Sequence, residues 1–137
     1  MDNKLTKILG TKYPLIQGGM AWVADAYLAA AVSNGGGLGL IAAGGMNEDL
    51  LRKEISLAKT LTDKPFGVNI MLMNPCAAGL AEVLIEEGVA VVTTGAGSPG
   101  KFIENWKKAG IVVIPVVAST GLAKRMESLG ADAVVAE

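Results

Sequence analysis

Residues 88–119, GVAVVTTGAGSPGKFIENWKKAGIVVIPVVAS, contain the pattern that decides the fold. Two apolar runs rich in branched residues, 89–93 and 111–117, flank a segment, 100–110, whose apolar residues recur every three or four positions. Such runs predict strands, and such spacing predicts an amphipathic helix. The apolar runs are continuous rather than alternating, which indicates strands buried on both faces of a parallel sheet. The stretch therefore predicts a strand–helix–strand unit.

The same unit repeats along the whole chain. Strands are predicted at residues 14–17, 38–41, 66–70, 89–93, 111–117 and 133–137, and helices at 25–34, 47–61, 79–88, 100–110 and 119–129. Three of the helices begin at residues that commonly cap a helix, namely Asp25, Asn47 and Ser119. Glycines that suit a left-handed helix end precede the next strand at intervals of 22 and 20 residues, at Gly88, Gly110 and Gly130. The repetition predicts successive right-handed βαβ units.

Two architectures use such units, the doubly wound open sheet and the eight-stranded barrel. The nearly constant length of the units favours the barrel. Because six strands cannot close an eight-stranded barrel, we predict an α/β fold that is an incomplete (β/α)8 TIM barrel, with about six parallel strands and five helices in one domain over residues 1–137. The final residues, AVVAE, read as the tip of a strand with no covering helix, so we expect an unfinished chain.

The composition excludes several classes of function. Hydrophobic residues make up 51% of the chain and charged residues 18%, and the net charge of −1 offers no basic face, so nucleic acid is not an expected partner. Cys76 is the single cysteine and histidine is absent, so we predict no disulfide and no metal site. The sequence has no apolar run long enough for a signal peptide or a membrane span, and we expect a cytoplasmic protein without membrane contact.

Candidate binding residues lie at the carboxyl ends of the predicted strands, where a barrel of this kind places its site. Small residues dominate at 17–21, 42–45 and 93–97, and they would let backbone approach a flat cofactor, although they could equally serve tight turns. Gln17 and Asn69 could offer amide groups to a heterocycle or bond neighbouring loop backbone. Glu137 could contact a ligand or be solvated.

Three other features of the sequence allow more than one interpretation. Residues 95–100 match G-x-G-x-x-G after a strand and before a helix, as in a dinucleotide fingerprint, but the next strand ends at Val117-Ala118-Ser119 without the required acidic residue. Cys76 has no neighbouring base in the sequence and reads as a packed thiol rather than a nucleophile. Met20, Met71 and Met73 flank the predicted loops and could line an apolar pocket or fill the core.

Several long segments together resemble one family. YPLIQGGMAWVAD (13–25), LTDKPFGVNIML (61–72), VVTTGAG (91–97) and AKRMESLGADAVVAE (123–137), with GGLGLI and AGIVVIPVVAS between them, resemble the flavin-dependent enoyl-acyl carrier protein reductase II and nitronate monooxygenase (2-nitropropane dioxygenase-like) family. The resemblance covers the first part of that family's longer chain. It implies that residues 1–137 are the N-terminal part of one FMN-binding barrel domain.

The resemblance also implies a cofactor, a chemistry and a set of residues. The cofactor would be FMN, reduced by NADH or NADPH, and the positions that match its binding residues are Gly19, Met20, Ala21, Asn69, Thr94 and Glu137. The family's catalytic histidine lies beyond residue 137, so the resemblance assigns no catalytic residue here, and we expect the chain to be inactive alone and to bind FMN weakly.

Three functions remain open. We favour reduction of an enoyl thioester on acyl carrier protein, and oxidation of a small nitronate is the alternative within the same family. A third possibility is a non-catalytic half-barrel module that pairs its open edges with another chain. We expect a homo-oligomer.

Overall fold

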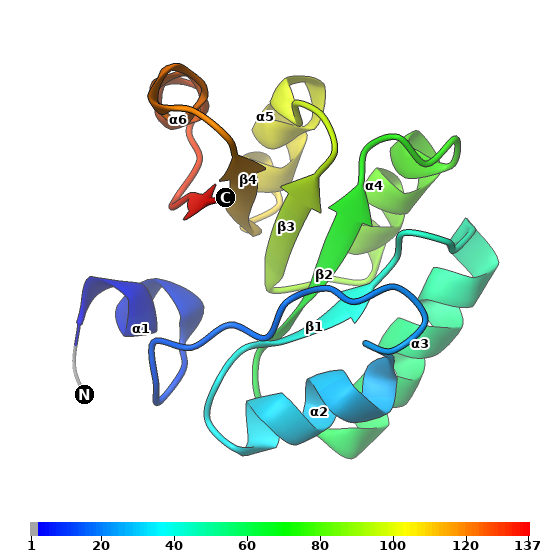
Figure 1. The fold of residues 1–137 in the computed structure, drawn as a ribbon. Helices are drawn as coiled ribbons and strands as arrows, with labels where there is room; N and C mark the ends of the chain where they lie inside the picture. The colour runs from blue at the N-terminus through cyan, green and yellow to red at the C-terminus, as the bar shows by residue number, and fades with distance from the viewer. Residues whose placement is uncertain (1–2) are drawn as a thin grey trace.

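A computed structural model describes residues 3–137 of the chain (Figure 1). The helices are α1 (Lys4–Leu9), α2 (Ala26–Asn34), α3 (Glu48–Leu61), α4 (Ala77–Glu86), α5 (Gly100–Lys108) and α6 (Thr120–Ser128). The strands are β1 (Gly39–Ala42), β2 (Phe66–Met71), β3 (Val91–Gly95), β4 (Val112–Val117) and β5 (Val135–Ala136).

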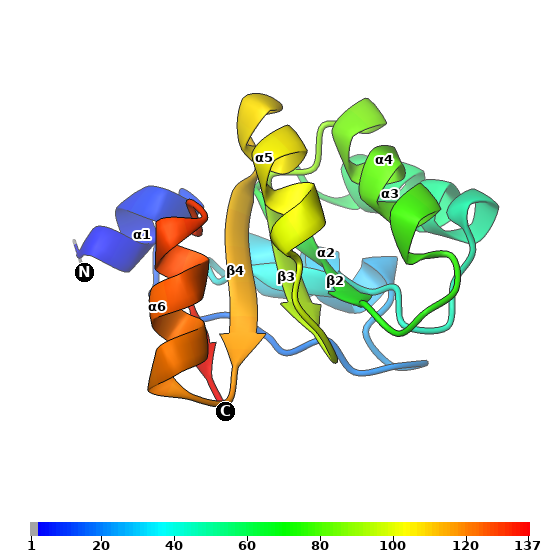
Figure 2. The same ribbon diagram turned by 90° about the horizontal axis from the view of Figure 1, so that it is seen from above.

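All five strands are parallel and pair in the order in which they occur in the chain. A doubly wound sheet would reverse the direction of strand addition and place helices on both faces. Here α2 to α6 follow the outer side of one curved sheet, and α1 lies across the opposite, inner side (Figure 1). Figure 2 shows α4, α5 and α6 side by side over the strands. The incomplete TIM-barrel prediction is therefore confirmed, and the open-sheet alternative is excluded.

The predicted strand at 14–17 is wrong as a strand, because it forms only a single parallel bridge between Ile16 and Leu38. The Leu38 N–H donates to the Leu15 carbonyl (2.8 Å), and the Gln17 N–H donates to the Leu38 carbonyl (3.0 Å). The next contact is made by a side chain, because the Leu40 N–H donates to Oε1 of Gln17 (3.1 Å). Gln17 thus continues the edge pairing where the backbone turns away at Gly18.

The structure contains a sixth helix, α1, that the hydrophobic pattern did not predict. Its six residues are held by a capping box at Asn3, in which the Thr6 N–H donates to Oδ1 of Asn3 (2.9 Å) and the Asn3 N–H donates to Oγ1 of Thr6 (3.1 Å). Leu9 of α1 is buried with Leu38, Leu40, Val91 and Ile114. This helix therefore covers the inner face at the amino ends of the strands.

The predicted helix boundaries are set by the expected caps. Asp25, Asn47 and Ser119 each accept a hydrogen bond from the N–H three residues later, at 2.9, 2.9 and 3.2 Å. The glycines that follow α4, α5 and α6 have φ values of 64°, 79° and 99°, at Gly88, Gly110 and Gly130. The helix predicted at 79–88 begins two residues earlier, at Ala77. Local capping chemistry thus fixes most of the repeat.

The main core lies between the sheet and the outer helices. Its fully buried members include Ile41, Ile55, Val68, Leu84, Ile103 and Trp106. In the part of the chain that the structure describes, the inner face carries the smaller cluster under α1, and no helix covers its carboxyl end. Within residues 3–137, no helix combines the length and the apolar character that crossing a bilayer would need. The architecture therefore leaves one concave surface for a ligand.

Candidate functional site

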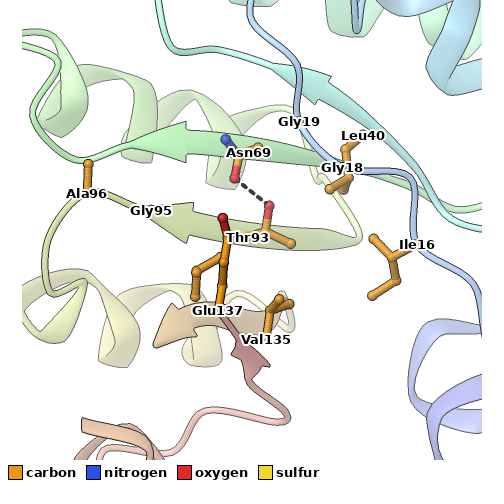
Figure 3. Close-up of a pocket in the computed structure, with 11 residues that line it drawn as sticks. Ile16, Gly18, Gly19, Leu40, Asn69, Thr93, Gly95, Ala96, Val135 and Glu137 are labelled. Atoms are coloured by element: carbon orange, nitrogen blue, oxygen red, sulfur yellow. Dashed lines mark hydrogen bonds between the residues drawn. The ribbon is translucent and has the colours of Figure 1, made fainter. Parts of the chain in front are cut away.

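A cavity of about 610 Å³ lies on the inner face at the carboxyl ends of the strands (Figure 3). This volume is in the range of small-molecule and cofactor sites. Residues from the 16–19 segment and from all five strands or the loops that follow them line it, namely Ile16, Gly18, Gly19, Leu40, Asn69, Thr93, Gly95, Ala96, Val116, Val135 and Glu137. Most of the lining is apolar or glycine, with polar groups from three residues.

Asn69 and Thr93 form the polar centre of the cavity. They are register partners on β2 and β3, so both side chains point to the inner face. The Thr93 hydroxyl donates to Oδ1 of Asn69 (2.8 Å), which fixes the orientation of the amide (Figure 3). Within the described part of the chain, no residue accepts a hydrogen bond from Nδ2 of Asn69. Asn69 therefore lines the cavity with an oriented amide, whose nitrogen lies beside Gly19.

Gly19 lies directly against Asn69. A Cβ atom at Gly19 would be 2.6 Å from Cβ of Asn69 and 2.8 Å from its Nδ2, distances that real side chains do not adopt. The absence of a side chain is what allows the 18–19 backbone to pass across the end of β2. This close approach brings backbone amide groups to the rim of the cavity.

Gln17, in contrast, is turned away from the cavity. Its Oε1 accepts from the Leu40 N–H, and its Nε2 donates to the carbonyl of Gly18. Of the two readings for this amide, the structure supports satisfaction by neighbouring backbone. Asn69 is the amide that faces the cavity.

Glu137 contributes the carboxylate of the site. Its N–H donates to the carbonyl of Val117 (3.1 Å), which extends the β4–β5 pairing by one residue and sets it across from Thr93 and Asn69 (Figure 3). Among the lining residues that the structure describes, Glu137 alone has a side chain that titrates. The site thus combines an acceptor at Glu137 with the donor at Asn69.

Three of the predicted site residues lie outside this lining. Met20 is 45% exposed and belongs with Ala21 to the loop beyond Gly19. The side chain of Thr94 is fully buried on the helix-facing side, where its neighbours across the sheet are Ile70 and Pro115. Its hydroxyl has no hydrogen-bond partner in the described structure. The structure brings together Gly19, Asn69 and Glu137 and leaves Met20, Ala21 and Thr94 apart.

Thr93 is a polar residue of the cavity that is not among the residues predicted from the sequence to bind the cofactor. It lies one position before Thr94, and the Val91-Val92-Thr93-Thr94 run is buried throughout. Thr93 is the register partner of Asn69, and this pairing shows that its side chain lies on the inner face. The pairing of two strands cannot be deduced from the sequence of β3 alone. Because β3 is buried on both faces, its sequence carries no hydrophobic alternation that would identify the face of Thr93.

The 95–100 segment forms the turn between β3 and α5. Ala96 has a φ of 54° and Gly97 a φ of 142°, so the backbone turns sharply above the cavity. Gly95 and Ala96 line the cavity, whereas Gly100 begins the helix. The sequential strand order excludes the Rossmann context for this motif.

Comparison with known proteins identifies similar chains. The family model described as nitronate monooxygenase matches residues 2–137. FabK from Thermotoga maritima is 53% identical, with a TM-score of 0.98 over 99% of this chain and 44% of its own.

Two curated relatives match over a similar span. The (3aS,4S,5R,7aS)-5-hydroxy-7a-methyl-1-oxo-octahydro-1H-indene-4-carboxyl-CoA dehydrogenase of Mycobacterium tuberculosis is 40% identical over 133 residues, which are 97% of this chain and 38% of the relative. A nitronate monooxygenase of Paraburkholderia phytofirmans is 33% identical over 97% of this chain and 47% of its own length. The chain spans less than half the length of each of these proteins.

Proposed function

Because this chain belongs to the nitronate monooxygenase family, a family of oxidoreductases, we propose that its inner-face cavity is part of an FMN site. The family is flavin-dependent in general. The observation that carries the proposal is the meeting of Gly19, Asn69 and Glu137 around one cavity. These three residues are also positions that the family resemblance implies for FMN binding.

The residues at the cavity fit a flavin. The close approach of Gly19 to Asn69 presents flat backbone where a planar ring would lie, and Leu40, Val116 and Val135 supply apolar surface. The free Nδ2 of Asn69 is a donor that suits a ring carbonyl or nitrogen. The Glu137 carboxylate accepts from N–H or hydroxyl groups. Gly19, Asn69 and Glu137 are therefore the residues we propose to hold FMN, with the backbone of Met20 and Ala21 continuing the same loop.

When bound, FMN would supply the redox chemistry, taking a hydride from NADH or NADPH and passing it to a substrate. The residues of this chain would bind the cofactor and orient it. Asn69, oriented by Thr93, would offer its amide to the cofactor, and the apolar lining would exclude water from the part of the cofactor that it contacts. Within the described lining of the cavity, the carboxyl group of Glu137 is the one ionisable side chain, and we propose that it accepts a hydrogen bond from the cofactor.

For the substrate we propose an enoyl thioester carried by acyl carrier protein. The chain is 53% identical to FabK of Thermotoga maritima, an enoyl-acyl carrier protein reductase II, and 33% identical to the nitronate monooxygenase of Paraburkholderia phytofirmans. This difference in identity supports the reductase. Oxidation of a nitronate is the second candidate, because the matching family model carries that description.

Two assays test this function. Because the chain spans less than half the length of its relatives, activity is assayed on the full-length protein that contains it. That protein should show the visible absorption of bound flavin and should oxidise NADH or NADPH, whereas residues 1–137 alone should be inactive. The full-length protein should then reduce a crotonyl thioester faster than it oxidises an alkyl nitronate. Faster turnover of the nitronate would overturn the reductase assignment while leaving the flavin site intact. Failure to retain or bind FMN would overturn the flavin site.

A further inference from the structure

The loop that carries the proposed FMN contacts also holds an unusual residue, Trp22. Its side chain is 87% exposed, and its backbone has a φ of 66°. A bulky residue in the left-handed region is strained and persists where its surroundings hold it. One edge of the indole lies close to Gly45, because a Cβ at Gly45 would lie 2.8 Å from Cζ2 of Trp22. Trp22 thus docks the 18–24 loop on the loop that follows β1.

Asn74 in turn fixes the loop that follows β1. Its Nδ2 faces the carbonyls of Met46 (2.9 Å), Gly44 (3.3 Å) and Ala43 (3.4 Å). Its Oδ1 accepts from the N–H of Cys76 (2.8 Å), at the start of α4. The Asn74 side chain is buried, with 9% of the residue exposed. One amide therefore ties the loop after β1 to the loop after β2.

Together these contacts form a continuous path to the cavity. Asn74 holds the 43–46 loop, Gly45 of this loop supports Trp22, and Trp22 belongs to the loop that starts at Gly18 and Gly19. The far end of that loop is fixed where the Ala42 N–H donates to the Ala24 carbonyl (2.8 Å). Both ends and the middle of the loop therefore depend on its neighbours after β1 and β2.

We propose that Asn74 is a positioning residue that acts through Gly45 and Trp22 to set the backbone of residues 18–21 against the flavin. This inference rests on the proposed FMN site and extends it, since neither Asn74 nor Trp22 lines the cavity. An aspartate at position 74 keeps Oδ1 but replaces the donor with an oxygen that faces three carbonyls. An alanine at Gly45 leaves Asn74 intact and displaces the indole directly.

The test uses a matched pair of glycines in the purified protein. Gly45→Ala should weaken FMN binding about tenfold or more, as Asn74→Asp should. Gly44→Ala should bind as the wild type does, because a Cβ at Gly44 meets only Cβ of Met71, at 3.7 Å. Time-resolved fluorescence anisotropy reports the mobility of the exposed Trp22 indole against the fixed background of Trp106, which is fully buried. Gly45→Ala and Asn74→Asp should change the mobility of the indole, and Gly44→Ala should not.

A double variant separates positioning from general damage. In a Trp22→Ala background the indole no longer opposes a side chain at position 45, so Gly45→Ala should have no further effect on FMN affinity. If Gly45→Ala changes the anisotropy of the indole but binds FMN normally, the inference is wrong and the FMN site stands. If Gly45→Ala weakens binding equally in both backgrounds, Trp22 is not the link. If the wild type binds no FMN, both proposals fail.

Discussion

Thr93 and Thr94 are adjacent, chemically identical and buried, yet they belong to opposite faces of the sheet. Thr93 faces the cavity and orients Asn69, whereas Thr94 faces the helices and has no hydrogen-bond partner in the described structure. The helix-facing side is packed with apolar residues from end to end. The inner side is packed only at its amino end, under α1. The outer face thus accounts for the stability of the fold, and the carboxyl end of the inner face is left for binding.

The largest expected effect concerns the outer face. Trp106 is fully buried, its Nε1 donates to the Ala81 carbonyl (3.1 Å), and its ring centroid lies 5.3 Å from that of Phe102. Trp106→Ala should lower the free energy of unfolding by about 3–5 kcal/mol, as measured by urea denaturation. Trp22→Ala is the matched control, and it should change that free energy by no more than about 0.5 kcal/mol because Trp22 is exposed. Equal losses in the two variants would contradict the assignment of stability to the outer face.

The adjacent threonines give a smaller and more specific test. Thr93→Val removes the hydrogen bond to Asn69 and should cost about 1 kcal/mol of stability and about tenfold in FMN affinity. Thr94→Val replaces an unpaired buried hydroxyl with a methyl group, so stability should be unchanged or higher by up to about 1 kcal/mol. FMN affinity should be unaffected by Thr94→Val. If flavin fluorescence titration showed a loss of FMN affinity in Thr94→Val, Thr94 would have to be counted as part of the FMN site.

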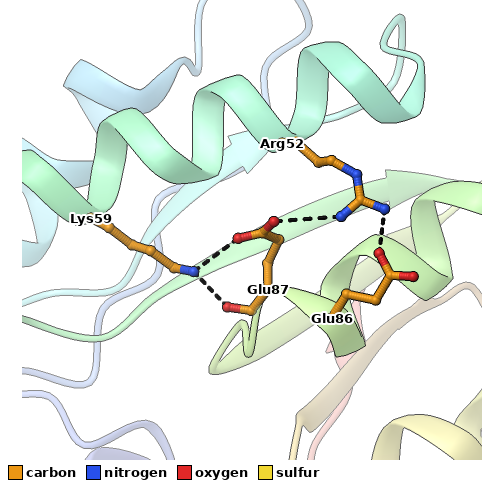
Figure 4. Close-up of polar contacts among 4 residues, drawn as sticks. All are labelled: Arg52, Lys59, Glu86 and Glu87. Carbon is orange, nitrogen blue, oxygen red and sulfur yellow. Dashed lines mark hydrogen bonds and ion pairs between the residues drawn. The ribbon is translucent and has the colours of Figure 1, made fainter.

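The smallest effect lies farthest from the cavity, in the ion pairs that join α3 and α4 (Figure 4). Arg52 pairs with Glu86 and Glu87, and Nζ of Lys59 lies 3.0 Å from Oε2 of Glu87. The hydrogen bond from Lys59 lowers the pKa of Glu87 below its ordinary value of 4.5. A carboxylate with a lowered folded-state pKa adds stability above its unfolded pKa, and that stability is lost as pH falls through the folded value.

Lys59→Met should therefore cost less than about 1 kcal/mol near neutral pH, and the pH-dependent part of that cost should vanish in acid once Glu87 is protonated. Urea denaturation at about pH 7 and about pH 3 measures it. Lys108→Met is the control, because its pair with Glu104 joins two exposed side chains of the same helix and should matter less. If the stability cost of Lys59→Met grew on acidification, the direction assigned to the pKa shift of Glu87 would be wrong.

Much of the fold could be predicted because it depends on local chemistry. Asp25, Asn47 and Ser119 begin helices as expected, and the left-handed glycines end them. The helix α1 escaped prediction because six residues are too few to show a helical period. The apolar residues of the 14–17 segment predict a strand, because they resemble those of the true strands. Its backbone leaves the sheet after Gln17, whose side chain makes the next contact.

The site was predictable only in part, for a physical reason. Gly19, Asn69 and Glu137 could be placed together because the carboxyl ends of parallel strands meet at one edge. The choice between Thr93 and Thr94 could not be made, because a strand buried on both faces has no hydrophobic alternation to mark its faces. Asn74 acts on carbonyls 28 to 31 residues away in sequence, and no local pattern reveals such contacts.

The most direct test of the central claim is the FMN affinity of Asn69→Ala, measured by flavin fluorescence titration. The account predicts a dissociation constant at least about tenfold higher than that of the wild type, or about 1.4 kcal/mol of binding free energy. Asn34→Ala, which removes a bond to the Leu61 carbonyl at the other end of the fold, should bind FMN normally. Wild-type affinity in a folded Asn69→Ala protein would contradict the claim that the inner-face cavity holds the flavin.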